Sequence, residues 1–279
     1  MAASGLFPVP QQDHFVEWRR RIVSKRWQQT ATAIALVLLI GFASHMCEVQ
    51  WKSLLLGVHK GLPIVGMFFP PAWSGAAGML QPLGVTAVMA LTATILGMCL
   101  SLPCALAASS NLAPAPLRLL MRLFIGLERG LPEIVQLLLL VAIFGLGPVP
   151  GLVALSLSSI GMLAKLLADA IEEIEPAMLE SVASIGATRS QVIRYGVIPQ
   201  VLPALLSNGL FRFEFNVRQG VILGAVGAGG IGYVMSSSMN SLDYQRASMA
   251  TLMTLGLVFL SERVSDLLRG RIFKGGSQP

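Results

Sequence analysis

Apolar residues in this chain gather into six long runs that are separated by shorter polar stretches. A helix needs roughly 20 mostly apolar residues to cross a membrane, and each run has about that length or more. The stretches between the runs are too short to hold a substantial soluble domain. The pattern predicts an all-α integral membrane protein with six transmembrane helices, at Gln28–Met46, Pro82–Ser109, Pro116–Leu146, Gly151–Ala170, Ile198–Gly220 and Gln245–Leu268.

The composition and the placement of charge support this prediction. Hydrophobic residues make up 54% of the 279 residues and charged residues only 12%, which excludes an ordinary soluble domain. The net charge of +6 does not require nucleic acid, because thirteen of the twenty Lys and Arg residues fall on the side of the N-terminus. Only Lys52, Lys60 and Arg246 fall on the other side. This asymmetry predicts that both termini are cytoplasmic.

The segments outside the apolar runs complete the expected organisation. Residues 1–27 mix aromatic residues and cations at helical spacing, which predicts a cytoplasmic interfacial helix, with a solvated basic tail as the alternative. Residues 28–46 form a first transmembrane helix that is retained, because no signal-peptide cleavage site follows them cleanly. Residues 47–81 carry paired prolines and predict an external loop. Residues 272–279 form a cytoplasmic tail.

One polar segment, residues 172–197, predicts a helical hairpin between two spans. Pro176 suits the first turn of a helix, and apolar residues then recur at helical spacing up to Ile185. Gly186 interrupts this helix, and a second short helix is expected at Thr188–Tyr195. From these residues alone, a docking surface for a soluble partner and an ordinary cytoplasmic loop are both open.

The hairpin resembles the coupling motif of ABC-importer permeases. Glu180-Ser-Val-x-x-x-Gly186 is followed after nine residues by Gly196-x-Ile198-Pro199, where the family usually has Glu-Ala-Ala-x-x-x-Gly and Ile-x-Leu-Pro. The spacing is kept, although four positions carry other residues. In that family the hairpin inserts into a cleft of the cytoplasmic ATPase subunit. The resemblance therefore implies these ATPase-coupling residues: Glu180, Ser181, Ala183, Gly186, Ala187 and Arg189.

The resemblance extends from about Pro82 to Arg271 and is to the phosphonate/phosphite branch of these permeases. It rests on stretches that include Arg129-Gly-Leu-Pro-Glu133, Phe144-Gly-Leu-Gly-Pro148, Phe211-Arg-Phe-Glu-Phe-Asn-Val-Arg218 and Leu223-Gly-Ala-Val-Gly-Ala-Gly-Gly-Ile-Gly232. It implies a type I ABC-importer permease fold. Residues 82–271 would then be the permease core, with five transmembrane helices and the coupling hairpin 172–197.

The same resemblance implies partners and a location. A second copy of the chain, two cytoplasmic ABC ATPase subunits and an external binding protein, periplasmic or lipid-anchored, would complete a phosphonate or phosphite importer of the bacterial inner membrane. The chain has no Walker G-x-x-x-x-G-K-[ST] sequence, so we expect a transport subunit that is not an enzyme and holds no cofactor, with ATP and Mg bound by the ATPase. A permease for an amino acid or another oxyanion, and an ATP-independent secondary transporter, remain as alternatives.

Charged residues inside the apolar runs are costly in a membrane and need a cause. Glu214 and Arg218 are four apart, as are Lys165 and Asp169, so each pair shares a helix face and predicts a structural ion pair. Arg212 points about 120° away from Arg218 and is expected to meet another span or the pathway. The alternative reading, that cations offset the charge of a permeant anion, gives these substrate-pathway residues: Arg129, Arg212, Asn216 and Arg218.

A glycine-rich stretch with the pattern G-x-G-x-x-G contains Gly227, Gly229, Gly230 and Gly232. A dinucleotide fold is excluded because no strand precedes the stretch. We expect tight packing or a broken helix, whose exposed amides could contact an anion. Cysteine and histidine residues are scattered along the chain, so no metal site is predicted.

Overall fold

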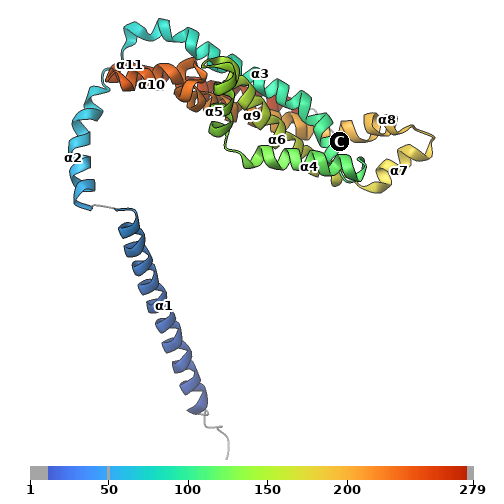
Figure 1. Ribbon diagram of the computed structural model, residues 1–279. Coiled ribbons are helices and arrows are strands. Elements are labelled where there is room, and N and C mark those ends of the chain that lie inside the picture. Colours follow the sequence, from blue (N-terminus) through green and yellow to red (C-terminus); the bar gives the residue numbers. More distant parts are fainter. Residues whose placement is uncertain (1–11, 49–50, 275–279) are drawn as a thin grey trace, which may run out of the picture. The chain divides into compact units, whose positions relative to one another are not determined.

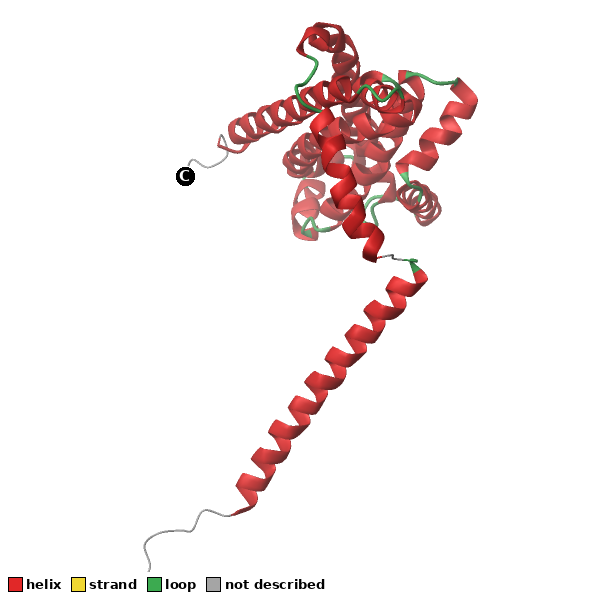
Figure 2. Ribbon diagram, turned by 90° about the vertical axis from the view of Figure 1, so that its left-hand side faces the viewer, coloured by secondary structure: helices red, strands yellow, loops and turns green. Residues whose placement is uncertain are grey.

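The computed structural model describes residues 12–48 and 51–274, and the regular secondary structure in these ranges is entirely helical (Figure 2). The chain divides into two compact units, Met1–Val65 and Gly66–Pro279.

The first unit holds helix α1, Gln12–Met46, and most of helix α2, Trp51–Met67. No proline occurs within α1, and the helix passes residue 27 without a break, so the expected boundary between an interfacial helix and a first span is not a helix boundary. Its apolar part, Trp27–Met46, is long enough to cross a membrane. The segment expected to be an external loop is partly helical, because it contains α2.

The second unit is a bundle in which three helices pack against one another at the centre and four further helices cover them. Figure 1 shows these helices running side by side along much of their length. The central helices are α3 (Ala76–Ala108), α6 (Pro148–Glu172) and α9 (Ile198–Leu223). Two helices, α4 (Ala115–Gly130) and α5 (Glu133–Phe144), pack on α6. Two others, α10 (Gly230–Asn240) and α11 (Tyr244–Lys274), pack on α3 and α9. A short 3₁₀ turn, η1 (Trp73–Gly75), precedes α3.

Small residues bring α3 and α6 close together. A Cβ added to Gly97 of α3 would lie 2.4 Å from the Cβ of Ser159 on α6, so the two helices approach as closely as a glycine allows. Membrane helices commonly associate through such small residues because lipid offers no hydrophobic drive between them. On α6, Leu155, Leu163 and Leu167 are completely buried against the neighbouring helices.

Four helices in the described ranges are long and apolar enough to cross a membrane: Trp27–Met46, Trp73–Ala108, Pro148–Glu172 and Tyr244–Arg271. A fifth span is formed if Arg189–Ala228 and Gly230–Asn240, which are bent by 56°, are taken together. The apolar runs that begin at Pro82, Gly151, Ile198 and Gln245 thus each correspond to a helix of the bundle.

The expected single span Pro116–Leu146 is wrong, because it is two helices, α4 and α5. The break lies at Leu131-Pro132. Proline has no N–H to donate and disfavours the helical conformation of the residue before it, and Leu131 is extended at φ −92° and ψ 122°.

The polar hairpin projects from the end of the bundle where α3 ends and α4 begins (Figure 1). It consists of α7 (Pro176–Ser184), α8 (Arg189–Gln191) and η2 (Val192–Val197), a wide turn of π-helix that leads directly into α9. The expected second helix at Thr188–Tyr195 is therefore a short α-helical turn followed by a π turn, and Pro199 lies within the first turn of α9.

Candidate functional site

The hairpin segment, residues 172–197, is shaped by two local signals. Gly186 has φ +84°, a conformation that L-residues rarely adopt, and no atom lies within 4 Å of a Cβ added there. Glycine is needed at this position for its backbone conformation and not for space. Thr188 then caps α8 in a capping box, with its backbone N–H donating to the side chain of Gln191 at 2.7 Å.

The hairpin segment is attached to the bundle at its base and exposed at its tip. The π turn packs closely against α7, because a Cβ added to Gly196 would lie 3.4 Å from Cδ2 of Leu179. The Arg189 guanidinium donates to the carbonyl of Leu112 in the connection between α3 and α4. Ile185 at the tip is 82% exposed. An apolar tip on a fixed base is suited to docking against another protein.

The residues that the sequence predicts for coupling lie together on this segment. Five of them are exposed and one is half-buried: Glu180, Ser181, Ala183, Gly186 and Arg189 are exposed, and Ala187 is half-buried. The hydroxyls of Ser181 and Ser184 donate to carbonyls within α7, so they add no contact to the bundle.

A second polar cluster lies deep in the bundle around Arg212 of α9. Arg212 is 3% exposed and forms an ion pair with Glu133 of α5 at 2.9 Å. It also donates to the hydroxyl of Ser158 at 2.7 Å and, through Nε, to that of Ser159 at 3.0 Å. Both serines belong to α6, and Ser158 also bonds to Glu133. The cluster thus joins three helices through one guanidinium.

Asn216 extends the same cluster to α3. It is completely buried and donates to Thr94 of α3 at 2.9 Å and to Ser159 of α6 at 3.0 Å. Polar side chains in the membrane commonly bond across helices in this way. Arg212 and Asn216, which were predicted as substrate-pathway residues, therefore face other helices of the same protomer.

Glu128 of α4 forms a neighbouring contact with α5 and α6. Its carboxylate accepts a hydrogen bond from Gln136 at 3.1 Å. The carboxylate also fills the space beside Gly161 of α6, where an added Cβ would lie 1.4 Å from it.

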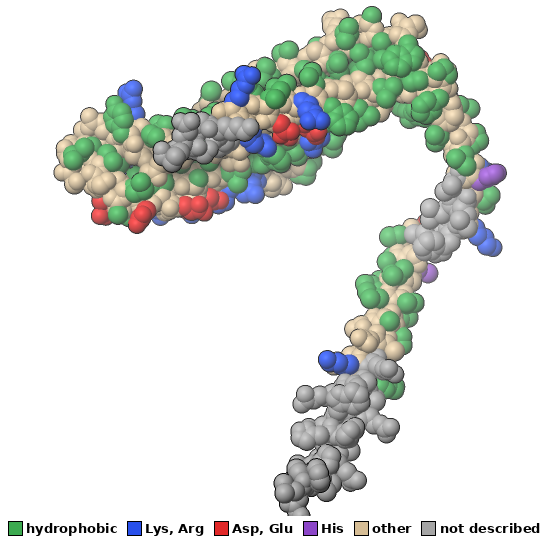
Figure 3. Space-filling view, turned by 180° about the vertical axis from the view of Figure 1, so that it is seen from behind, with side chains coloured by type: hydrophobic (Ala, Val, Ile, Leu, Met, Phe, Trp, Pro, Cys, Tyr) green, Lys and Arg blue, Asp and Glu red, His purple; other side chains and the backbone are tan. Residues whose placement is uncertain are grey.

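The predicted ion pair between Glu214 and Arg218 is wrong. Arg218 pairs instead with Glu262 of α11 at 3.0 Å, and Glu214 lies 3.9 Å from Arg269 of the same helix. Helix α11 packs along α9. Glu262 and Arg269 are seven residues apart and so share one face of α11. Each of them gives a charge on α9 a partner of opposite sign. Figure 3 shows acidic side chains gathered beside basic ones on the second unit.

The predicted pair of Lys165 and Asp169 is present as an ion pair within α6. Arg129 makes none of the hydrogen bonds of the cluster around Arg212. It is exposed near the end of α4, where it lines a small cleft together with Lys165 and Asp169.

The glycine-rich stretch breaks the helix after α9, which was one of the two roles expected for it. The π-helical segment η3 (Gly224–Ala228) contains Gly227 at φ +124°, and the chain bends before α10. The other role, tight packing, is also present, because a Cβ added to Gly232 would lie 1.9 Å from the carbonyl oxygen of Val221. The amide of Ile231 bonds to Thr86 at 3.0 Å, so this amide is not directed at an anion.

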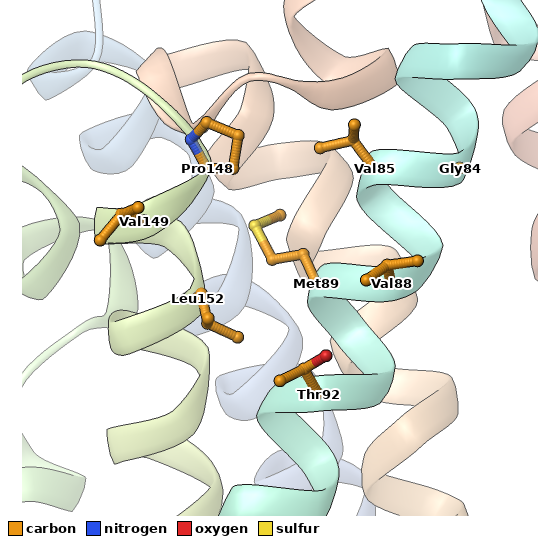
Figure 4. Close-up of a pocket in the computed structure, with 8 residues that line it drawn as sticks. All are labelled: Gly84, Val85, Val88, Met89, Thr92, Pro148, Val149 and Leu152. Atoms are coloured by element: carbon orange, nitrogen blue, oxygen red, sulfur yellow. The ribbon is translucent and has the colours of Figure 1, made fainter.

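The larger cavity between α3 and α6 is apolar (Figure 4). It has a volume of about 460 Å³, and Thr92 supplies its single hydroxyl. Val85, Val88 and Met89 of α3 face Val149 and Leu152 of α6 across it. No charged side chain lines this cavity, so it has no group that would bind an oxyanion.

The comparisons with known proteins point to one class. Residues 97–274 match the family model described as "Binding-protein-dependent transport system inner membrane component". The chain is 32% identical over 268 residues to the phosphite transport system permease protein PtxC of Stutzerimonas stutzeri, covering 94% of this chain and 95% of that protein. It is 37% identical over 215 residues to the phosphate-import permease protein PhnE of Mycolicibacterium smegmatis, covering 75% of this chain and 40% of that protein.

Solved structures show the same fold. An inward-facing structure of the MetNI methionine ABC transporter matches with a TM-score of 0.62 at 20% identity, covering 70% of this chain and 95% of that chain. A chain of an amino acid ABC transporter matches with a TM-score of 0.57 at 21% identity, covering 80% of this chain and 99% of that chain.

Proposed function

Because the chain belongs to the family of binding-protein-dependent transport system inner membrane components, we propose that it is the permease subunit of an importer for phosphorus oxyanions such as phosphite and phosphonates. The observation that carries this proposal is the similarity to the phosphite permease PtxC along nearly the whole length of both chains. Relatives named for methionine transport match only about half of this chain, 54% for MetP of Bacillus subtilis.

In this proposal the energy comes from other subunits. Two cytoplasmic ABC ATPases hydrolyse ATP, and an external binding protein delivers the oxyanion. A second copy of the chain, or a related permease, completes the pathway. Because the sequence contains no Walker phosphate-binding motif, hydrolysis is assigned to the partners.

The hairpin segment is the proposed docking surface for the ATPase. Its support is the exposed apolar tip at Ile185 and the base that continues through the π turn into α9. A push on α7 would reach α9 through the contact of Leu179 with Gly196. In this proposal the hairpin segment and both termini face the cytoplasm.

The intramembrane charges divide into two groups under this proposal. Arg212 and Asn216 hold helices of one protomer together, because both are buried and donate hydrogen bonds to side chains of α3, α5 and α6. Arg218 is half exposed, so it is the cation on α9 that remains accessible to a passing anion.

The test is transport by the reconstituted complex. Permease, ATPase and binding protein are placed in liposomes with ATP on the ATPase side, and the entry of phosphite, methylphosphonate and methionine is measured by ion chromatography. We expect ATP-dependent entry of the phosphorus compounds alone. Entry of methionine without phosphite would overturn the substrate assignment. Entry in the absence of ATP would favour a secondary transporter.

A further inference from the structure

A second, smaller cavity lies between α4 and α6 near the hairpin segment, and charged side chains contribute to its lining. Its volume is about 190 Å³, the space that about six water molecules occupy in liquid water. This is enough for one small tetrahedral oxyanion with some water. We call this cavity the α4–α6 cleft. It is lined by Ala108, Arg122, Ile125, Gly126, Arg129, Lys165, Ala168 and Asp169.

Small residues keep the α4–α6 cleft open. Arg122, Gly126 and Arg129 are spaced four and three residues apart, so they share one face of α4. Gly126 lies between the two arginines, and nothing lies within 4 Å of a Cβ added there. Ala108 of α3 is buried. The cleft therefore has small residues between two arginine side chains.

The charges around the α4–α6 cleft do not cancel within the described residues. Arg122 pairs with Glu172, and Lys165 pairs with Asp169. Arg129 forms no ion pair with any residue in the described ranges. Its sequence neighbour Glu128 is engaged elsewhere, beside Gly161 and Gln136. Arg129 is therefore the cation of the cleft lining that carries an unbalanced charge among the described residues, and it is free to bind an anion from outside.

We propose that the α4–α6 cleft binds one phosphorus oxyanion, held by Arg129. A planar guanidinium can bond two oxygens of such an anion at once. Lys165 is already paired with Asp169, so Arg129 supplies the net positive charge. The proposal does not depend on which solute the protein transports.

Binding in this cleft would change a contact close to the hairpin segment. The anion competes with Glu172 for Arg122, and Glu172 is the last residue of α6, four residues before α7 begins at Pro176. Arg122 stays anchored during this competition, because its Nε also donates to the carbonyl of Ala108 at 2.9 Å. Glu172 keeps the hydrogen bond that it accepts from the backbone N–H of Ser110 at 2.6 Å, so occupancy weakens the link between α4 and the end of α6 without detaching α6 from the connection between α3 and α4.

Two sources can supply the same chemistry: a free oxyanion from solution and the phosphate of an anionic lipid headgroup. The first arm of the test uses the full-length protein in phosphatidylcholine nanodiscs and titrates inorganic phosphite by calorimetry at constant ionic strength. The second arm uses phosphatidylglycerol nanodiscs and measures, by native mass spectrometry, the anionic lipid that the protein retains.

Three variants make the test specific. In the arm that shows binding, Arg129→Gln should weaken it at least about tenfold, as expected for the loss of one charge-assisted hydrogen bond. Arg129→Lys keeps the charge but loses the two-point contact, so its affinity should lie between those of the wild type and of Arg129→Gln. Arg118→Gln removes an arginine from the same helix that bonds to the carbonyl of Ser110 and does not line the cleft, so it should bind as the wild type does.

The two arms distinguish a free oxyanion from a lipid headgroup. Phosphite binding that depends on Arg129 supports a free oxyanion, and lipid retention that depends on Arg129 supports a headgroup. If Arg129→Gln and Arg118→Gln behave alike in both arms, the proposal is wrong. A folded Arg129→Lys variant that binds no better than Arg129→Gln would also contradict it, because the retained charge should hold the anion more tightly than a neutral amide does.

Discussion

Replacing Arg212 with glutamine should destabilise the fold far more than the same change at Arg218. Arg212 is 3% exposed and bonds to Glu133, Ser158 and Ser159, whereas Arg218 is 50% exposed and pairs with a partner that is 40% exposed. The two arginines lie on the same helix and undergo the same chemical change, so each serves as the control for the other.

The magnitude follows from what each substitution leaves behind. Removing one member of a buried ion pair strands the other charge and costs about 3–5 kcal/mol. That cost shifts the unfolding equilibrium by more than about a hundredfold. An exposed pair contributes only about 0–1 kcal/mol. Because Glu133 is 15% exposed, the stranded carboxylate in Arg212→Gln would have little access to water.

A double variant tests whether the stranded charge is the cause. Adding Glu133→Gln to Arg212→Gln removes the second charge, so we expect about 2 kcal/mol to be recovered, within the range for residues in contact. Stability would be measured by reversible denaturation in mixed micelles, with the amount of folded protein from size-exclusion chromatography as a second readout. If Arg212→Gln is as stable as the wild type, or if the double variant loses the sum of both single losses, the buried pair does not have the structural role assigned to it.

Three further predictions concern glycines and topology. Gly186→Ala should strain the hairpin segment by about 1–2 kcal/mol because of its positive φ, which lowers the phosphite transported per ATP hydrolysed. Gly78→Ala is the control: it lies in α3, nothing lies within 4 Å of the added Cβ, and it should leave this ratio unchanged. Gly161→Ala should cost about 1–3 kcal/mol through overlap with a buried carboxylate, whereas Gly126→Ala has free space and should be neutral or stabilising in thermal denaturation. In a background without native cysteines, a cysteine at Ser184 should react with an impermeant reagent only after cells are opened, and one at Ser74 should react in intact cells; the reverse pattern would invert the topology.

The long apolar runs and the hairpin could be predicted from the sequence because each depends on residues close together in the chain. A run of apolar residues predicts a membrane helix by its length alone, and Pro176 and Gly186 mark the limits of α7 by local backbone preference. The helix break at the glycine-rich stretch follows for the same reason. The break between α4 and α5 also has a local signal, Pro132. A prediction from hydropathy alone misses this break, because apolar stretches lie on both sides of it.

The partners of the charged residues could not be predicted in this way. Spacing along one helix allowed Glu214 to meet Arg218, but the packing of α11 against α9 provides other partners for both. Glu133 was not identified as the partner of Arg212 because 79 residues separate them. Only the packing of α5, α6 and α9 brings this pair together with the two serines. The sequence shows only that polar residues occur inside apolar runs. This identifies residues that need a partner but does not show which partner each one has.

The wide turn at Val192–Val197 determines where the chain can change its length. A π turn holds one residue more than an α turn, so losing one residue there would narrow the turn and leave α7 and α9 in nearly their present orientation. Losing one residue within α9 before Arg212 would instead rotate that side chain by about 100°, away from Glu133. Related chains that differ by a single-residue insertion or deletion in this region should therefore differ inside the π turn and keep the length of α9 that follows it.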